Sequence, residues 1–317
     1  MIIDATCAPA DIRYPTDLSL LNEAREKTEK IIDILHKPLK GKIKKVRTYR
    51  QKARREYLKV AKKRRPSKKI IRKAIGKQLR YIRRNLRYIQ ELSEVSSLSL
   101  LTNKQYQDLQ VIKKLYEQQL YMYENKVNSV KKRIVSISQP HVRPIVRGKA
   151  GSPVEFGAKI SLSAVDGFVF LDRLSWESYN EAGDMIRQIE LYKKRFGYYP
   201  ESVHVDKIYR NRLNRAYCKD HEIRLSGPPL GRPKKVDKDQ QKQTKEDELA
   251  RIPIEGKIGN GKRRYGLNRI MAKLEETSET TIATIILVMN MEKILRDFLL
   301  LIFLLYKNRL FFIKYKN

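Results

Sequence analysis

Cysteine and histidine are scarce in this chain of 317 residues. The two cysteines, Cys7 and Cys218, form no Cys-x-x-Cys pair, and the four histidines are scattered along the sequence. Because a structural zinc ion needs closely spaced cysteine and histidine ligands, this pattern argues against a zinc site. Two lone thiols also exclude a disulfide framework at this length and suit a reducing environment. We therefore expect a cytoplasmic protein.

Long uninterrupted hydrophobic segments are absent as well. The first apolar run has two residues before Asp4 interrupts it, so the N-terminus does not read as a signal peptide. The apolar runs 282–289 and 298–306 are separated by charged residues, and neither reaches the roughly 18–20 residues of a membrane span. We expect a buried helix, an apolar tail and no membrane partner, with a tail-anchored or membrane-touching protein as the alternative.

Acidic residues are outnumbered two to one. The chain has 69 Lys and Arg against 35 Asp and Glu, which gives a net charge of +34 and a pI near 10.1. A field of this sign attracts polyanions and makes their binding strongly dependent on salt. The charge alone does not distinguish DNA, RNA and anionic lipid as partners. With 41% hydrophobic residues, the chain can bury one large core or two smaller ones.

The most basic part of the chain has a helical pattern. Residues 40–87 contain 23 Lys and Arg but a single acid, Glu56. Such a surplus repels itself unless a polyanion is bound, so we expect DNA contact here, with a solvated face as the alternative. Apolar residues then recur every three or four positions, and Pro66-Ser67 before them predicts two helices in place of one. These apolar residues are Ile71, Ile75, Leu79, Ile82, Leu86 and Ile89.

The remainder predicts an α/β fold with a mixed sheet flanked by helices and one foreign helical block after the first strand. Alternating or apolar runs predict strands at 133–137, 141–146, 156–162, 167–171, 201–205 and 223–226. Six segments follow from the shifts in pattern and composition. They are 1–16 (first strand of the core), 17–132 (basic helical insertion), 133–226 (main part of the core), 227–247 (polar linker), 248–296 (core helices with a third acid) and 297–317 (apolar and basic tail).

Three carboxylates stand in separately recognisable contexts. Asp4 and Asp206 end short apolar runs of strand type, and Glu255 opens a basic segment that leads into a helical pattern. Three carboxylates on separate elements are what a site needs to hold two divalent cations for phosphodiester chemistry. In so basic a chain, the natural substrate of such a site is nucleic acid. Taken singly, each acid also reads as an ordinary turn, cap or surface residue.

Four blocks of sequence carry a more specific signal. They are DATCAPADIRYPTD, PIVRGKAGSPVEFGAKI, YPESVHVDKIYRNRLNR with RLSGPPLGRP, and RIPIEGKIGNGKRRYGLNRI. Together, and in this order, they resemble the DDE transposases of bacterial insertion sequences. The resemblance extends from residue 2 to about residue 296.

The resemblance implies a ribonuclease H-like core with a long all-helical insertion after its first strand. In such a core, Asp4 lies on the first strand, Asp206 lies just after the fourth, and Glu255 lies on a following helix. These three acids would be the catalytic residues and would hold two Mg²⁺ ions, which Mn²⁺ can replace. No small-molecule cofactor is implied.

The family's signature around the third acid is Tyr, two residues, Arg, three residues, Glu, six residues, Lys. Arg251, Glu255 and Lys262 match it, while Glu248 stands at the tyrosine position. We expect Arg251 to neutralise or orient Glu255. The residues expected to grip the phosphates of the cleaved strand are Lys262, Arg263 and Arg264.

Two further features have competing interpretations. Arg147 and Lys149 flank a glycine and predict a second phosphate contact, with a simple turn as the alternative. Trp176, the only tryptophan, could stack on an unpaired base near a cleavage site. Core packing after a strand is the interpretation that we favour for Trp176.

The expected function is that of a transposase, which cleaves DNA with water and then joins strands through a DNA 3′-hydroxyl. Its partners would be the element ends and target DNA in the bacterial nucleoid, and the resemblance implies a homodimer in the synaptic complex. The alternatives are a non-catalytic basic nucleic-acid-binding protein and a nuclease with the same core. Family members begin with a helical DNA-binding region, whereas only three residues precede Asp4 here, so we expect a truncated or internally started copy, either active or inactive.

Overall fold

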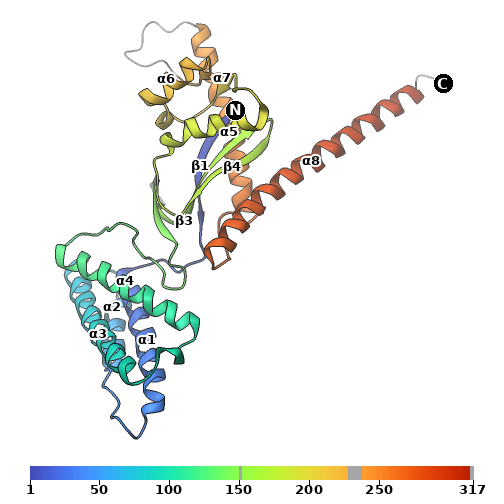
Figure 1. The fold of residues 1–317 in the computed structure, drawn as a ribbon. Helices are drawn as coiled ribbons and strands as arrows, with labels where there is room; N and C mark the ends of the chain where they lie inside the picture. The colour runs from blue at the N-terminus through green and yellow to red at the C-terminus, as the bar shows by residue number, and fades with distance from the viewer. Residues whose placement is uncertain (150–151, 228–237, 315–317) are drawn as a thin grey trace. The chain divides into compact units, whose positions relative to one another are not determined.

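The chain forms two compact units (Figure 1). One, the α/β unit, is built from residues 1–11 and 145–317, and the other, the helical unit, from residues 12–144. The computed structural model describes residues 1–149, 152–227 and 238–314.

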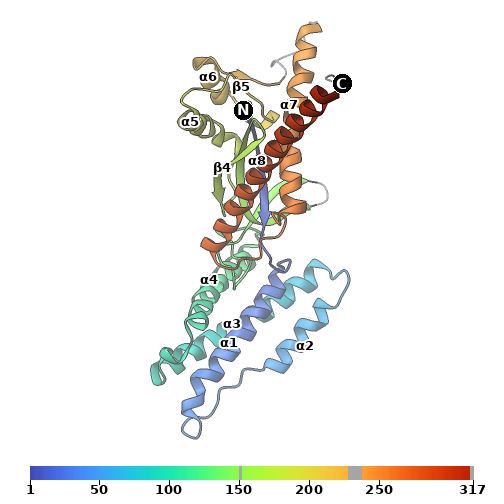
Figure 2. The same cartoon turned by 90° about the vertical axis from the view of Figure 1, so that its right-hand side faces the viewer.

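Four α-helices make up the helical unit. Helix α1 packs along α3, and α2 lies beside both (Figure 2). The N-terminus of α3 is capped by Ser67, whose side chain accepts a hydrogen bond from Ile70 N at 3.5 Å, so the predicted break at Pro66-Ser67 is confirmed. The helices are α1 (Asp17–His36), α2 (Arg50–Ala61), α3 (Lys68–Val95) and α4 (Asn103–Asn125).

The apolar stripe predicted for α3 faces the core of the helical unit. Leu79, Ile82 and Ile89 are buried, and the other three members of the stripe are partly buried. Burying a Leu or Ile side chain contributes about 1.5–3 kcal/mol. The partners of Leu79 and Ile82 in this core include Leu20, Leu21, Ala24, Ile112 and Leu115.

The strand predicted at 133–137 is wrong. Ile134 and Ile137 are buried in the core formed by α1, α3 and α4, with the backbone in an irregular conformation. Ile134 N donates a hydrogen bond to the Gln118 side chain at 3.0 Å, so a helix side chain satisfies a backbone group that a neighbouring strand would otherwise pair. The apolar residues of this segment therefore cover helices.

The sheet of the α/β unit is built on β1, which is longer than predicted. Asp4 lies in the middle of this strand and does not end it, because pairing with β3 continues from Ile2 to Pro9. At the far end, a Cβ atom on Gly157 would lie 2.1 Å from the Ala8 carbonyl oxygen, so only glycine fits there. The antiparallel sheet comprises β1 (Ile2–Pro9), β2 (Arg143–Lys149), β3 (Ser152–Val165) and β4 (Phe168–Ser175), in the order β1-β3-β2 with β4 also on β3.

A parallel pair, β5 (Ser202–Val203) and β6 (Arg224–Leu225), lies beside the other edge of β1. Ile3 N donates to the His204 carbonyl at 3.0 Å, and His204 N donates to the Met1 carbonyl at 2.9 Å. These bonds extend the sheet to the order β4-β3-β1-β5-β6, with β1, β5 and β6 parallel to one another. The result is the mixed α/β architecture that we expected at the level of fold class.

Two helices pack against the part of the sheet that contains β1, β5 and β6. A 3-10 turn, η3 (Glu181–Asp184), leads into α5 (Met185–Phe196), which ends at Gly197 with φ 86°. A second 3-10 turn, η4 (Lys207–Tyr209), is followed by α6 (Arg212–Asp220). The core beneath them contains Ile3, Met185, Ile189, Val203, Tyr209 and Cys218.

The polar linker predicted at 227–247 is wrong from Lys238 onward, since α7 spans Lys238–Arg264; residues 228–237 lie outside the described residues. Although Pro253 lies inside α7, tertiary contacts hold the helix. Ile254 is fully buried, and Gly261 lies so close to α8 that a Cβ atom would meet Met289 Sδ at 3.2 Å. Polar composition alone did not reveal this helix because its apolar contacts are few.

The tail predicted at 297–317 is a continuation of α8 (Glu275–Lys314), and residues 315–317 lie outside the described residues. The helix contains no Gly or Pro that would end it. Ile282, Ile286 and Met289 are buried, whereas Leu287 and Val288 are exposed, so the helix predicted at 282–289 is buried on one face only. Across the described residues, no helix is both long enough and apolar enough to cross a membrane.

Candidate active site

Asp4 projects from the centre of the sheet and is half-buried. One of its carboxylate oxygens accepts a hydrogen bond from Ala5 N at 2.8 Å. Burial raises the pKa of Asp4 above its usual value; the Ala5 N–H opposes this change, and the negative charge of Glu181 adds to it. The positive charge of Arg251 lowers the pKa of Asp4, and the negative charge of Glu255 raises it.

Asp206 and Glu255 meet at Arg251. Asp206 follows β5 and caps η4 by accepting a hydrogen bond from Lys207 N at 2.9 Å. The two terminal nitrogens of Arg251, on α7, lie 3.5 Å from Asp206 Oδ1 and 3.5 Å from Glu255 Oε1. Both carboxylates are more than half exposed, at 58% and 60%, so these contacts contribute little to stability. Through these contacts, the guanidinium group of Arg251 holds two acids from different elements close to itself.

The orientation of α7 depends on Asp247, one turn before Arg251, which the sequence did not single out. Its buried carboxylate accepts hydrogen bonds from Arg224 at 2.8 and 3.0 Å and from Gly227 N at 3.3 Å. These contacts join α7 to the end of β6. Because Asp247, Arg251 and Glu255 are spaced four residues apart, the anchored residue fixes the face of α7 that carries the other two.

The donor set suits a hard divalent cation, because carboxylate oxygens are the ligands that Mg²⁺ prefers. Tyr209 belongs to η4, the turn that Asp206 caps, and its buried phenol oxygen has no hydrogen-bond partner among the described residues. In the described part of the chain, no group of three or more His, Cys, Asp or Glu side chains is arranged closely enough to hold a metal. Arg251 is the positive charge that neutralises Asp206 and Glu255 in this arrangement.

One comparison bears on the identity of this site. Residues 203–292 match the model of a family described as a transposase DDE domain. The match supports a DDE transposase. The matched segment contains Asp206, Arg251 and Glu255, whereas Asp4 lies outside it. No curated protein and no solved structure matches the chain.

The basic residues predicted near the third acid lie at the C-terminal turn of α7, within the segment that matches the DDE domain. Lys262 is partly buried, and Arg263 is exposed and donates to Asn260 Oδ1 at 3.3 Å. Arg264 lies 3.4 Å from Glu292 of α8. The side chains of Arg147 and Lys149, on β2, lie outside the described residues.

Trp176 belongs to the core of the α/β unit. It is 7% exposed, and its indole N–H donates to Glu279 of α8 at 2.9 Å. The favoured prediction of core packing is therefore confirmed, and the ring presents no open face to a nucleic-acid base.

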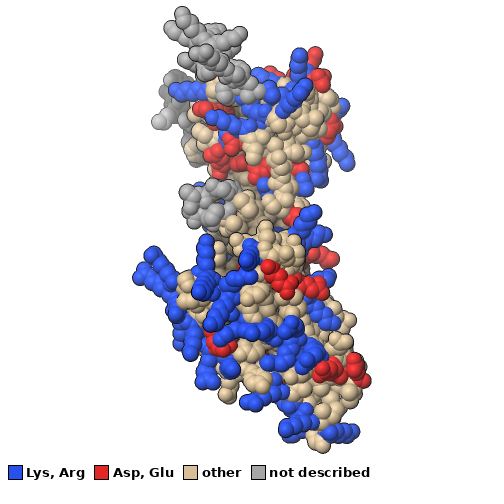
Figure 3. Space-filling view, turned by 90° about the vertical axis from the view of Figure 1, so that its left-hand side faces the viewer, with Lys and Arg blue, Asp and Glu red and all other residues tan. Residues whose placement is uncertain are grey.

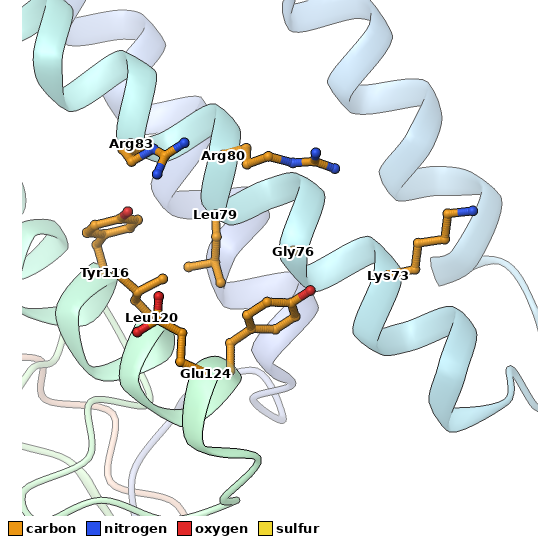
Figure 4. Close-up of a pocket in the computed structure, with 9 residues that line it drawn as sticks. Lys73, Gly76, Leu79, Arg80, Arg83, Tyr116, Leu120 and Glu124 are labelled. Carbon is orange, nitrogen blue, oxygen red and sulfur yellow. The ribbon is translucent and has the colours of Figure 1, made fainter.

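Lys and Arg side chains gather on the helical unit, as Figure 3 shows. A groove of about 350 Å³ lies between α3 and α4 (Figure 4). Lys73, Arg80 and Arg83 of α3 line it together with Tyr116 of α4. The transposase DDE domain is thus accompanied by a helical unit whose surface charge suits a polyanion.

Proposed function

We propose that this chain catalyses metal-dependent DNA cleavage and strand transfer as the transposase of an insertion sequence, acting as a homodimer on DNA in the bacterial cytoplasm. The proposal rests above all on the junction at Arg251, where Asp206 and Glu255 meet inside the segment that matches the DDE domain. The strand order β4-β3-β1-β5-β6 supports a ribonuclease H-like core. Of the five strands in that order, Asp4 lies on the first in the sequence, β1, and Asp206 follows the fourth, β5.

The acids are not grouped closely enough in the described structure to hold a metal by themselves. Asp4, Asp206 and Glu255 would therefore hold two Mg²⁺ ions, with Mn²⁺ as a substitute, together with a phosphate of the bound DNA. When bound, such ions activate the attacking oxygen and stabilise the leaving oxygen. Water attacks the scissile phosphorus and the bond to the 3′-oxygen breaks, which leaves a 5′-phosphate and a 3′-hydroxyl. The freed 3′-hydroxyl loses its proton and attacks a phosphorus of the target. The bond from that phosphorus to the 3′-oxygen of the target breaks, and this oxygen leaves as a hydroxyl group.

The remaining residues of the site bind and orient. Arg251 balances Asp206 and Glu255, and Lys262, Arg263 and Arg264 contact phosphates of the cleaved strand. Arg147 and Lys149 are a further proposed phosphate contact. The basic face of the helical unit holds flanking DNA through its phosphates.

Asp206→Asn tests the proposal because asparagine keeps the cap on η4 but removes a metal-binding charge. We expect Mg²⁺- or Mn²⁺-dependent nicking of DNA that carries the element's ends to fall at least about a thousandfold, which corresponds to about 4 kcal/mol. Asp220→Asn, an exposed acid on α6, is the matched control and should cleave normally. Binding of DNA without cleavage by any of the proteins would identify a non-catalytic nucleic-acid-binding protein.

A further inference from the structure

The C-terminal part of α8 carries apolar side chains that are left exposed in the described part of the chain. Between Leu287 and Tyr306, fourteen large apolar side chains of this helix are each at least 42% exposed. Figure 1 shows this part of α8 extending beyond the sheet of its own unit. A helix that is apolar on several sides is normally buried, and a large exposed apolar patch marks an interaction site. We therefore expect this part of α8 to have a partner.

The preceding part of α8 is held against β4, the edge strand of the sheet. The side-chain amide of Asn290 donates to the Val169 carbonyl at 2.7 Å, and its oxygen accepts a hydrogen bond from Val169 N at 2.9 Å. Ile282, Ile286 and Met289 are buried on the same side of the helix. Because one side chain bonds both backbone groups of Val169, α8 cannot rotate about its axis without breaking both bonds. The face of α8 that remains free is therefore fixed.

A row of exposed residues with heptad spacing runs along this free face. Its six members recur at intervals of four, three, four, three and four residues, and each is 54–61% exposed. A period of 3.5 residues is typical of the seam of a coiled coil. At 3.6 residues per turn, the row lies about a third of a turn away from the side that contacts β4. We call this row the α8 seam, and its residues are Leu287, Met291, Ile294, Phe298, Leu301 and Leu305.

A second copy of this chain is the partner that the α8 seam fits. The seam of another α8 has the same period, so side chains of each helix can insert between those of the other along the whole row. Such a contact uses the same surface on both copies and closes with two of them. Each of the fourteen exposed apolar side chains presents on the order of 100 Å². The available surface thus exceeds the about 800 Å² that each partner of a stable interface buries.

The charges on this part of α8 favour a protein partner over a lipid surface. Helices that lie on anionic membranes carry many Lys and Arg residues opposite their apolar face. Residues 287–306 contain two acids and two bases, so they have no surplus of positive charge. The same balance lets two copies of this segment approach each other without net repulsion.

We propose that two copies of this chain associate through the α8 seam, packed as in a coiled coil. The inference rests on the proposed function in one respect, since it names the surface that joins the proposed homodimer. It assigns that surface to the α/β unit, so self-association requires neither DNA nor the basic face of the helical unit.

Sedimentation velocity of the full chain without DNA, at low micromolar concentration and high salt, tests this assignment. We expect the unaltered protein to be a dimer, and Phe298→Glu with Leu301→Glu to weaken self-association at least about 100-fold. The matched control is Leu300→Glu with Phe303→Glu, which has the same spacing and added charge but lies outside the seam. It should remain a dimer. Circular dichroism melting curves identify any variant that does not fold. Phe298→Ala with Leu301→Ala, which keeps helix propensity and should weaken association about tenfold, then decides the outcome.

Four outcomes would overturn the inference. They are a monomeric unaltered chain, equal weakening in the seam variant and its control, dimers that persist in both seam variants, and binding to anionic phospholipid vesicles that only the seam variants lose. Nicking of DNA, compared with Asp206→Asn, tests the proposed chemistry separately. If nicking depends on Asp206 but the seam variants remain dimers, the inference fails and the proposed chemistry stands. If the seam variants dissociate but the unaltered dimer does not cleave DNA, the inference stands and the proposed chemistry fails.

Discussion

The two units of this protein treat charge in opposite ways. In the helical unit, the 23 Lys and Arg of residues 40–87 accompany one acid, Glu56, which Lys77 and Tyr81 already engage at 2.7 and 3.0 Å. In the α/β unit, acids and bases are paired between elements, as in the contacts of Arg173 with Asp184 and of Arg195 with Asp172, both at 2.6 Å.

This difference separates affinity from chemistry. A surplus of cations on one surface is enough to attract a polyanion, since the field acts over about a Debye length and needs no fixed geometry. Phosphodiester chemistry needs particular oxygen atoms at particular positions, and pairing supplies that order. We therefore expect the helical unit to govern how tightly DNA binds and the α/β unit to govern what happens to it.

The largest expected effect concerns the few buried charges of the helical unit. Arg25, 1% exposed, lies 2.6 Å from Glu29, which is 7% exposed. Arg25→Ala leaves Glu29 buried without its partner, so we expect the free energy of unfolding to fall by about 3–5 kcal/mol in urea titrations. The double variant Arg25→Met with Glu29→Leu should retain most of the stability. Equal losses in the two proteins would show that packing outweighs charge at this position.

The same glycine-to-alanine change should destabilise the α/β unit much more than the helical unit. In Gly157→Ala, the new methyl group would lie 2.1 Å from the Ala8 carbonyl, so β1 must shift and the free energy of unfolding should fall by about 3 kcal/mol. In Gly76→Ala, on α3, the methyl group meets only the hydroxyl end of the Tyr123 side chain, at 2.6 Å, while helix propensity gains about 1 kcal/mol. We expect little net change there. Thermal unfolding compares the two, and a large loss in Gly76→Ala would show that Tyr123 cannot move.

Surface cations of the helical unit should change DNA affinity without changing cleavage of bound DNA. Replacing four exposed cations between α2 and α3 by glutamine should weaken binding at least about tenfold and reduce the slope of log K against log salt by about 0.9 for each lost phosphate contact. Fluorescence anisotropy at several salt concentrations measures both quantities. The four residues are Lys62, Lys63, Arg64 and Arg65.

A matched control separates the position of the charges from their number. It removes four exposed cations of the α/β unit and should weaken DNA binding less. Equal weakening in both quadruple variants would mean that net charge alone determines affinity and that the helical unit has no special role. The control residues are Arg187, Lys194, Lys219 and Lys242.

The smallest effect concerns a paired acid of the α/β unit. Hydrogen bonds from Lys273 and Arg269 lower the pKa of Asp11 below its usual value of 3.8. A lowered pKa in the folded protein means that the stabilising contribution is present above the usual pKa and is lost as the pH falls through the lowered value. In Lys273→Gln, the pKa of Asp11 should rise toward its usual value in NMR titrations. Lys219→Gln should leave it unchanged.

Several elements could be predicted because their signals are local. The break at Pro66-Ser67 and the buried stripe of α3 follow from a turn signal and a 3.6-residue period. The segment 133–137 and the strand end at Asp4 were wrong because the same apolar residues can cover a helix or pair with a strand. Whether such a segment covers a helix or pairs with a strand depends on the element that it packs against, and that element lies far away in the sequence.

The candidate site likewise has a part that the sequence predicts and a part that it does not. The residues chosen from sequence, Asp4, Asp206 and Glu255, stand in recognisable blocks, but nothing in those blocks shows that Arg251 joins Asp206 to Glu255. The contacts of Asp247 that hold α7 had no sequence signal, since an acid inside a polar segment is common.

By itself, the sequence determined the composition-dependent properties of this protein: its net charge of +34, its amphipathic helices and its hard oxygen donors. These depend on which residues are present and on their spacing within one element. Only the tertiary structure decided which acids share a neighbourhood, which cation balances them and how far β1 and α8 extend. Such outcomes depend on hydrogen bonds and contacts between elements far apart in the chain, and no local pattern encodes the partner.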